Sequence, residues 1–483
     1  MTAEELIEKL KEIQNMKCET QTLELKSAFQ GCPKRLYDSL SSFSNQDDGG
    51  IIIFGIDEKQ NYKEVGVYDP QDIQKKINEQ CLQMEPVVRP LLTVVEKKGK
   101  YFVSAEIPGI DITERPCHYK GQGRLKGSYT RVGDSDEPMT EYEVYSYEAY
   151  RKKYQDDIRA ISRATFASLN QILLQKYIEL LKAGKPNLSM LPDEEIYELM
   201  SIKRNNEITL SAVLLFSPYP QAYFPQLSIV AIAVPGKEIG ETGEEGERFS
   251  DNQRIEGNIP EMLDGAINFV KRNMRSKTII DPETGKRKDK TDYPLTAVRE
   301  AIINALVHRD YSIHTEGMPI QIIIYEERME IHNPGGLYGR ITVDQLGKIQ
   351  PDTRNPVLAS ALEVLGITEN RYSGIPTIKR ELEEYHLKAP VFLNERGNFS
   401  VIFYKENKVE KSIDAVKEKD LLMFCKTPRT RKEISEYLGL NSVTYAIQAY
   451  VMPLVESGKI KLSVPDKPKS SKQLYYSEIK GEN

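Results

Sequence analysis

The chain has 483 residues, and its 66 lysines and arginines against 72 aspartates and glutamates leave a formal net charge of −6. Charged residues make up 29% and hydrophobic residues 39%, an ordinary globular composition that excludes a disordered or fibrous chain. The length predicts about three domains, and the mild acidity argues against a protein that coats nucleic acid by bulk charge.

The cysteines and the apolar runs point to a compartment. Five cysteines without paired spacing disfavour a disulfide scaffold and fit a reducing environment. The first residues, TAEELIEKLKEIQ, are amphipathic and charged, unlike a signal peptide. No apolar run approaches the ~18 residues that a membrane span needs. We therefore expect a cytoplasmic protein that makes no use of a membrane.

Residues 1–150 predict an α+β domain with a mixed sheet. Apolar spacing predicts helices over 4–15, 34–44 and 71–83, and strands over 22–26, 51–57, 91–96 and 101–107. The glycine-rich stretch 121–133 predicts a hairpin with a basic tip.

Acidic residues gather around the first two strands. Glu24 and Lys26 lie two residues apart in a strand and therefore share a face. Glu19 precedes the same strand, and Asp57 ends the next one. These carboxylates and the lysine, brought together, would bind a divalent cation and activate water for phosphodiester cleavage. The alternative is that acidic residues at strand ends are solvated surface.

Basic residues cluster around the predicted hairpin, where they would contact phosphates. Each of them taken singly is equally well explained as a solvated surface side chain. They are Arg115, Lys120, Arg124, Lys126 and Arg131. Cys81, Cys117 and His118 resemble a partial metal site, but a fourth ligand is missing, and we interpret them as core or surface residues.

Three motifs recur in order over residues 15–145: ETQTLELKS, FSNQDDGGIIIFGIDE and RPCHYKGQGRLKGSYTRVGDSDEPMT. Together they resemble the Schlafen-type AlbA_2 domain, with one residue more before the Gly-Gly pair than the family pattern has. In catalytic members, two glutamates and an aspartate cut structured RNA, notably tRNA, with a divalent metal. The resemblance implies that Glu19, Glu24 and Asp57 hold Mg²⁺ or Mn²⁺. Lys26 matches the family's lysine, and Glu58 is the alternative third carboxylate. Many bacterial members are instead described as DNA-binding regulators.

Residues 151–205 predict a charged helical connector, and residues 206–405 an α/β domain. In the second region we expect strands over 211–216, 227–234, 320–325, 329–332 and 391–404, helices over 259–274, 294–308 and within 340–385, and a hairpin tip or mobile loop over 276–292.

The helix VREAIINALVHRDYS carries a polar row on an apolar background. Glu300, Asn304 and His308 recur at every fourth position and so lie nearly in line. Such a row suits a Mg²⁺–triphosphate, with Asn304 supplying a metal oxygen and Glu300 orienting a water. The alternative is an ordinary helix surface. The HRDY stretch that follows is either a phosphate contact or a structural corner.

The runs HNPGGLYGRIT and RNPVLASALEVLGITENRYSGIPTIKREL follow that helix. With it they resemble, over residues 205–405, the GHKL-type ATPase fold in the variant found after AlbA_2 domains and often labelled RecG-like. The resemblance implies an ATP site built from the helix row (Glu300, Asn304, His308), a first glycine-rich box (Asn333, Gly335, Gly336) and a second box at 372–375 (Ser373, Gly374). Two departures stand out: Asn333 replaces the aspartate that normally reads adenine, and the second box keeps one glycine. Whether ATP is hydrolysed or only bound stays open. No GxxxxGK[ST] phosphate loop is present, which argues against a P-loop helicase engine.

Residues 419–483 predict a separate small domain. Three short helices followed by a hairpin are typical of a winged helix, and the family resemblance is to the winged tails of bacterial regulators. Lysines of the wing would contact phosphates: Lys467, Lys469 and Lys472. The alternative is a winged helix used for protein contacts.

The sequence thus predicts a bacterial α+β multidomain protein: an AlbA_2 mixed-sheet domain (1–150), a helical connector (151–205), a GHKL-like α/β sandwich (206–405) and a winged helix (419–483). The predicted function is a nucleic-acid-binding protein that acts as a metal-dependent endonuclease on tRNA-type RNA under the control of nucleotide binding. The alternative is a non-catalytic, DNA-binding transcriptional regulator with a nucleotide-sensing domain. A third possibility is an interaction protein with vestigial sites. RNA or DNA is the expected partner, and self-association through the central domain is expected.

Overall fold

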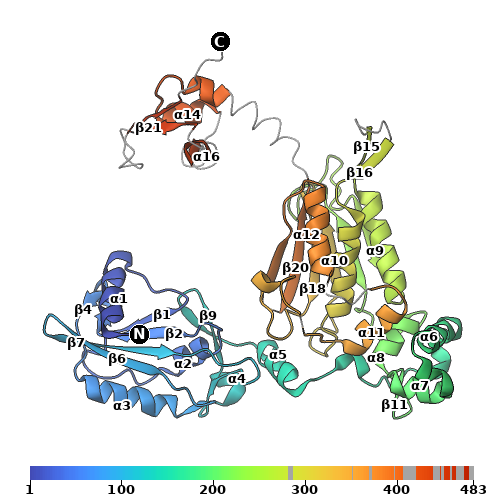
Figure 1. The fold of residues 1–483 in the computed structure, drawn as a ribbon, viewed down its shortest axis with the longest axis horizontal. Coiled ribbons are helices and arrows are strands. Elements are labelled where there is room, and N and C mark those ends of the chain that lie inside the picture. Colours follow the sequence, from blue (N-terminus) through green and yellow to red (C-terminus); the bar gives the residue numbers. More distant parts are fainter. Residues whose placement is uncertain are drawn as a thin grey trace. The chain divides into compact units, whose positions relative to one another are not determined.

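The structure of the protein is a computed structural model (Figure 1). It describes residues 1–280, 287–350, 352–368, 373–395, 397–405, 420–438, 447, 451–456, 459–463 and 473–477. The chain forms two compact units, Met1–Tyr404 and Lys405–Asn483, which we describe separately. The mixture of helices and sheets confirms the predicted α+β multidomain class.

We call residues 1–140 the N-terminal module. Its helices are α1 (Ala3–Met16), α2 (Tyr37–Ser44), α3 (Pro70–Cys81) and α4 (Gly123–Gly127). Its strands are β1 (Leu23–Lys26), β2 (Gly50–Phe54), β3 (Ile56–Asp57), β4 (Lys63–Glu64), β5 (Met84–Glu85), β6 (Leu91–Lys97), β7 (Lys100–Ile107), β8 (His118–Tyr119), β9 (Tyr129–Val132) and β10 (Ser135–Pro138).

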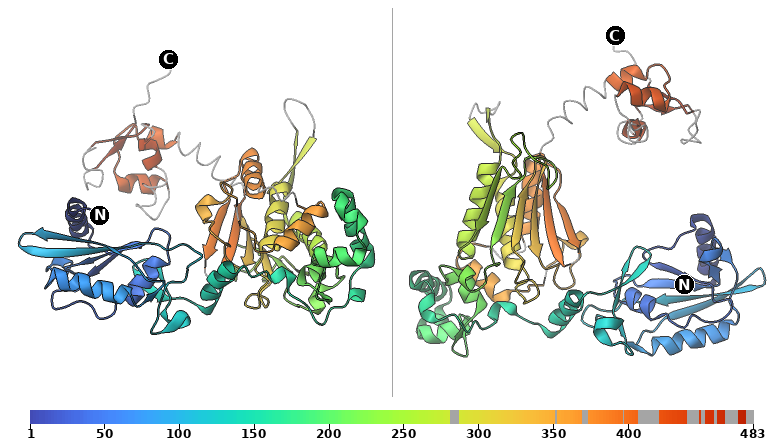
Figure 2. Two further views of the ribbon diagram at one scale, coloured as in Figure 1. Left: turned by 60° about the horizontal axis from the view of Figure 1, so that its bottom comes forward. Right: turned by 180° about the vertical axis from the view of Figure 1, so that it is seen from behind.

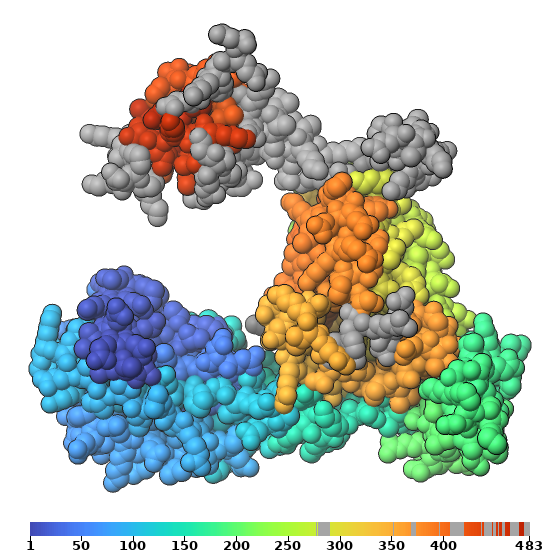
Figure 3. Space-filling view, viewed as in Figure 1, coloured from blue at the N-terminus to red at the C-terminus, as the bar shows by residue number. Residues whose placement is uncertain are grey.

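A sheet in the order β1-β2-β7-β6 forms the centre of this module. β1 runs parallel to β2, and the other neighbours are antiparallel. α1 starts at a capping box between Thr2 and Glu5 and buries Leu6, Leu10 and Ile13 against one face of the sheet. It is the darkest blue element in Figures 1 and 3. α2 and α3 pack their apolar residues against the other face.

Two local predictions in this module are wrong. The strand expected over 51–57 is broken into β2 and β3 at Gly55, whose φ of +110° favours glycine. A Cβ on Gly55 would lie 2.7 Å from the Phe102 ring, so the break also depends on the missing side chain. The stretch 121–133 is not a hairpin, because α4 occupies its first half. The hairpin is β9–β10, which turns at Gly133.

The predicted connector (151–205) lies within a longer segment, residues 141–216, which we call the connector from here on. It contains α5 (Glu141–Lys152), α6 (Gln171–Gly184), α7 (Asp193–Leu199), α8 (Leu210–Phe216), β11 (Lys203–Arg204) and β12 (Glu207–Ile208). The predicted strand over 211–216 is instead α8. Thr209 caps this helix by accepting a hydrogen bond from the backbone N–H of Ala212 at 3.3 Å. All seven residues of α8 are buried, so the sequence shows no periodicity that would distinguish a helix from a strand.

The central module is a layer of helices on a sheet. Its strands are β13 (Ile229–Ala233), β14 (Asp251–Ile255), β15 (Ser276–Ile280), β16 (Arg287–Thr291), β17 (Ile320–Ile324), β18 (Arg328–Pro334), β19 (Val391–Glu395) and β20 (Asn398–Tyr404). Its helices are α9 (Ile259–Asn273), α10 (Leu295–His308), α11 (Pro356–Val364) and α12 (Gly374–Glu384).

Six of these strands form one sheet in the order β14-β13-β17-β18-β20-β19. α9, α10 and α12 cover one face of it (Figure 2). The same hydrophobic core continues into α6 and α8, so the connector packs as part of the central module rather than as a separate spacer. The polar insertion predicted as a hairpin is the antiparallel pair β15–β16.

The unit 405–483 has its own small core, in which Leu421, Ile434, Val451 and Tyr475 are buried. Its described elements include α14 (Arg431–Tyr437), α16 (Met452–Glu456), β21 (Lys461–Leu462) and β22 (Tyr475–Tyr476). Helices followed by a strand pair agree with the predicted order of elements, and the winged helix stays a prediction. Across the described parts of both units, no helix has the length and hydrophobicity to span a bilayer.

Candidate functional site

A cavity of about 510 Å³ opens in the central module between α10, α12 and the end of β18. Its volume lies within the ~300–1,000 Å³ usual for small-molecule sites. All eight nucleotide-site residues predicted from the sequence line it: Glu300, Asn304, His308, Asn333, Gly335, Gly336, Ser373 and Gly374. Three segments far apart in the chain therefore converge on one space. Tyr372 lies outside the described residues.

The polar row of α10 meets the first turn of α12 at Gly374. A Cβ on this glycine would lie 2.8 Å from Asn304 Nδ2 and 3.2 Å from Glu300 Oε2, so glycine permits the close approach. Ser373 precedes α12 without a side-chain cap, which leaves backbone N–H groups of the first turn open to a ligand. A helix start of this kind attracts phosphate through its N–H groups and dipole.

Asn333 lies at the other wall of the cavity, on β18. It is only 4% exposed, and its Oδ1 has no hydrogen-bond partner among the described residues. A buried acceptor without a partner is costly unless a ligand supplies the donor. An exocyclic amino group of a nucleobase is such a donor. The chemistry of this donor set therefore fits an adenine nucleotide, with its base near Asn333 and its phosphates near Gly374.

Arg354 is a cavity residue that sequence reasoning missed. Its guanidinium pairs with Asp310 at 3.1 Å, donates to the Gly336 carbonyl oxygen at 3.1 Å and lies 5.1 Å from the centre of the Tyr338 ring. It thereby fixes the glycine-rich turn. Burial would raise the pKa of Asp310, but Arg354 and a 2.6 Å hydrogen bond from the Tyr142 hydroxyl hold it below its usual value. The Arg-Asn-Pro triplet at 354–356 was the available signal.

Arg309 of the HRDY stretch (residues 308–311) forms a structural corner. Arg309 is buried, and its guanidinium donates to the backbone oxygens of Thr315 and Met318. The His308 side chain is open to the cavity, but the protein atoms around it desolvate the ring. This desolvation, followed by the charge of Arg354, lowers the pKa of His308, so its imidazole is neutral at pH 7. His308 therefore offers the cavity a hydrogen-bonding ring rather than a cation.

The acidic residues of the N-terminal module form a different arrangement from the one predicted. Glu19 accepts a 2.6 Å hydrogen bond from the Leu25 N–H. Burial, followed by repulsion from Glu24 and Glu58, raises its pKa to about 7, although the Leu25 hydrogen bond and Lys26 act in the opposite direction. The charge of Glu58, the alternative third carboxylate, thus helps to raise the pKa of Glu19.

Asp57 belongs to a different surface. Its carboxylate accepts a 2.8 Å hydrogen bond from Gln60 and lines a groove together with Lys63 and Lys100. Asp57 ends β3, and Glu58, which begins the short 3-10 helix 58–60, does not line this groove. Among the described residues, no group of three His, Cys, Asp or Glu side chains is arranged to hold a metal ion. Glu19, Glu24 and Asp57 do not assemble a ready-made metal centre.

Glu24 is held in a buried charge network. It is 5% exposed and forms ion pairs with Lys26, on the same strand face as predicted, and with Arg131 at 2.9 Å. Arg131 also pairs with Asp136 at 2.8 Å, and Asp136 accepts further hydrogen bonds from Ser39 and Ser42 at 2.6 Å. The negative charge of the Glu24 carboxylate is therefore already balanced by Lys26 and Arg131.

The predicted phosphate-binding cluster divides in two. Arg115 and Arg131 are buried, and Arg115 pairs with Asp47 at 2.6 Å, so both guanidinium groups serve the fold and the phosphate interpretation is wrong for them in this structure. Arg124 pairs with Glu148. Two members are exposed, Lys120 and Lys126. The wing residues Lys467, Lys469 and Lys472 lie outside the described residues.

Cys81, Cys117 and His118 are buried, as the core interpretation expected. Cys117 donates its N–H to Asn45 Oδ1 at 2.7 Å, and Asn45 in turn donates to the Cys117 and Tyr129 carbonyl oxygens at 3.0 Å. These residues tie α2 to β9 and have no arrangement that would bind a metal.

Three family models match the chain. Residues 19–140 match the family described as "Schlafen, AlbA_2", and residues 317–403 match "Putative ATP-dependent DNA helicase recG C-terminal". Residues 417–476 match "Filamentation induced by cAMP protein Fic-like, C-terminal domain". The first two matches confirm the resemblances carried by the sequence motifs. The second match begins after α10, so the polar row lies outside it.

Solved structures with similarity to the chain are distant. The DIP2311 protein from Corynebacterium diphtheriae has 17% identity, with 92% of each chain covered and a TM-score of 0.39. The N-terminal domain of a RecG-related protein from Nitrosomonas europaea has 27% identity, with 29% of this chain and 94% of that chain covered and a TM-score of 0.23. No curated protein matches the chain.

Proposed function

Because the chain matches the Schlafen AlbA_2 and RecG-like ATPase family models, we propose that it is a nucleic-acid-binding protein whose central module binds ATP. The observation that carries the ATP assignment is the cavity lined by all eight predicted residues, with the unpartnered Oδ1 of Asn333 on its wall. Asn333 would accept the amino group of adenine, and the start of α12 would receive the phosphates. Mg²⁺ would enter with the triphosphate, with Asn304 supplying a metal oxygen and Glu300 orienting a water.

Replacement of Asn333 with leucine tests the base contact. The variant keeps a side chain of similar size but loses the acceptor, and we expect ATP affinity to fall about 5- to 150-fold, the range for a lost buried hydrogen bond. The measurement is the ATP-induced rise in melting temperature across a nucleotide titration. Asn333→Asp, which keeps an acceptor, is the matched control. Equal ATP shifts in the wild type and the leucine variant would refute the assignment.

A finer proposal is that the N-terminal module cleaves RNA. Its support is Glu19, a half-buried carboxylate beside Lys26 whose pKa of about 7 suits a general base at neutral pH. In this proposal Glu19 takes the proton of a ribose 2′-hydroxyl, whose oxygen attacks the adjacent phosphorus. The bond from phosphorus to the 5′-oxygen breaks, and the leaving oxygen takes a proton from water. The products are a 2′,3′-cyclic phosphate and a 5′-hydroxyl, and Glu19 returns its proton to solvent. Lys26 would offset charge on the phosphate. No metal is needed for this route.

Cleavage of tRNA by the wild type and by Glu19→Gln tests this proposal. General bases contribute about 10²–10⁴-fold, so we expect the variant to lose at least that factor while still binding RNA. Because the base must be ionised, the rate should rise with pH up to about 7 and then level off. Glu8→Gln, at an exposed carboxylate of α1 outside both sites, is the control and should keep the rate.

Metal dependence distinguishes the remaining possibilities. Reactions in EDTA and in Mn²⁺ separate the Glu19 route from a metal-dependent one, which would leave 3′-hydroxyl and 5′-phosphate ends and stop in EDTA. Absence of cleavage of any RNA or DNA, combined with DNA binding, would favour the alternative of a non-catalytic transcriptional regulator.

A further inference from the structure

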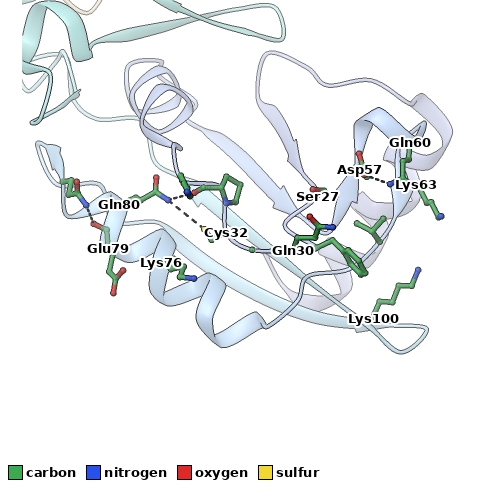
Figure 4. A pocket seen from close by; sticks show the side chains of 16 residues that line it. Ser27, Gln30, Cys32, Asp57, Gln60, Lys63, Lys76, Glu79, Gln80 and Lys100 are labelled. Carbon is green, nitrogen blue, oxygen red and sulfur yellow. Dashed lines mark hydrogen bonds between the residues drawn. The ribbon is translucent and has the colours of Figure 1, made fainter.

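The N-terminal module carries a second, larger hollow that none of the predicted basic residues lines. It is a groove of about 1190 Å³ between the loop 27–34, the β3–β4 hairpin and α3. Figure 4 shows Asp57, Lys63 and Lys100 at one end and Lys76 at the other. Its volume exceeds the ~300–1,000 Å³ of ordinary small-molecule sites. The groove therefore suits a length of polymer better than a single metabolite. We call it the lysine groove.

The lining of the lysine groove is positively charged. Four lysines line it, Lys34, Lys63, Lys76 and Lys100, against the carboxylates Asp57 and Glu79. Lys76 pairs with Asp72 at 2.7 Å. Lys34 and Lys63 are exposed and have no ion pair among the described residues, and Lys100 donates only to the Glu64 backbone oxygen at 2.7 Å. Lys34, Lys63 and Lys100 thus outnumber the carboxylates Asp57 and Glu79 along one groove. This excess of positive charge is the electrostatic pattern for a phosphate backbone.

An aromatic ring stands in the same groove. Phe29 lines the groove and is 57% exposed, so its ring is accessible to a ligand there. The preceding residue, Ala28, is buried, and its carbonyl oxygen accepts the Tyr68 N–H at 3.2 Å. Ala28 also has φ +42°, a left-handed conformation that is costly for a non-glycine residue. The anchored, strained residue turns the chain so that Phe29 faces outward. Strain held beside an exposed ring is a reason to look for a ligand.

We propose that the lysine groove binds a single-stranded segment of nucleic acid, with a base stacked on Phe29 and the backbone along Lys34, Lys63 and Lys100. A positive groove with an aromatic platform is the usual construction for single strands, since a duplex hides the faces of its bases. This inference rests on the nucleic-acid binding proposed above and adds its location and strandedness. Asp57 at the groove's end is followed directly in the chain by Glu58, whose charge acts on Glu19.

Fluorescence anisotropy with the full chain and labelled 12-nucleotide probes, U12, dT12 and a matched duplex, tests the proposal. We expect Phe29→Ala to weaken single-strand binding about 5- to 150-fold, the range for one stacked base. The Lys63→Ala/Lys100→Ala variant should reduce the slope of log affinity against log salt by about 1.4, two phosphate contacts on a single strand. Duplex binding should not change. The U12 and dT12 arms decide between RNA and DNA.

The controls are an exposed phenylalanine and two exposed lysines elsewhere: Phe249→Ala and Lys176→Ala/Lys271→Ala. All substituted side chains are exposed, and melting temperatures verify that each variant folds. Wild-type binding of single strands that both groove variants retain would overturn the groove assignment alone. Wild-type binding of the duplex only would also overturn it. Absence of binding to every probe would overturn the proposed nucleic-acid function together with this inference.

Discussion

Arg131→Ala is expected to destabilise the N-terminal module by about 3–5 kcal/mol, the usual consequence of removing one partner of a buried ion pair. The Arg131 side chain is 1% exposed and pairs with both Glu24 and Asp136. It also donates to the Leu23 backbone oxygen at 3.3 Å and lies over the Phe43 ring. Truncation leaves Asp136 without the Arg131 cation and Glu24 with Lys26 alone, and it removes the hydrogen bond from β9 to the Leu23 backbone oxygen of β1. Because the chain has no tryptophan, calorimetry or circular dichroism is the appropriate measurement.

Arg124→Ala is the matched control, since the Arg124–Glu148 ion pair is partly exposed and should contribute less than about 1 kcal/mol. A double variant, Arg131→Met with Asp136→Asn, removes one stranded charge and should recover part of the lost stability. If Arg131→Ala melts like Arg124→Ala, Arg131 is free to bind phosphate and the structural role assigned to it is wrong.

Gly335→Ala is expected to cost about 3 kcal/mol or more and to abolish ATP binding. Gly335 has φ +102°, where an L-residue pays about 1–2 kcal/mol. A Cβ there would also lie 2.5 Å from Asp310 Cβ and 2.5 Å from Arg354 Nη1, and 3.0 Å from the Asp310 backbone nitrogen. The Asp310 backbone cannot move away from the added Cβ as a flexible side chain could. The Arg354–Asp310 pair that shapes the cavity would therefore separate.

Gly336→Ala is the neighbouring comparison. Its Cβ would come within 3.4 Å of only the Asn394 Oδ1, at 2.8 Å, which is the end of a side chain. That oxygen accepts the Leu337 N–H at 2.9 Å, so we expect a cost of about 0.5–1.5 kcal/mol, that of one hydrogen bond. Thermal melting with and without ATP measures both variants. Equal behaviour of the two glycine variants would show that Gly335 is not the constraint on the turn.

The nucleotide site illustrates what local pattern can predict. Helical spacing alone places Glu300, Asn304 and His308 in one row, because the period of a helix is the same in every fold. The two glycine-rich boxes are recognisable because only glycine permits a close backbone approach at Gly374 or a positive φ at Gly335. These constraints are local, and the cavity confirms that the segments meet.

The N-terminal module illustrates where local pattern is insufficient. Glu24 and Lys26 share a face, as their spacing in a strand requires, and they pair. However, the basic side chain that completes their network, Arg131, comes from a strand more than 100 residues away and was predicted at the surface. Rules of local spacing do not relate residues so far apart in the chain. Whether a charge is buried depends on which elements cover it in the folded protein.

The sequence by itself therefore determined the class of fold, the polar row of α10 and the face shared by Glu24 and Lys26, because each depends on short-range backbone periodicity. The two domain resemblances rest instead on motifs that match known families in order along the chain. Only the tertiary structure decided that α8 is a helix, since a segment buried on all sides shows no periodicity. It likewise decided that Arg131 and Arg115 serve the core, and that Asp57 lies with Lys63 and Lys100 in the lysine groove. Those outcomes depend on which distant segments pack together, and that is a property of the folded chain as a whole.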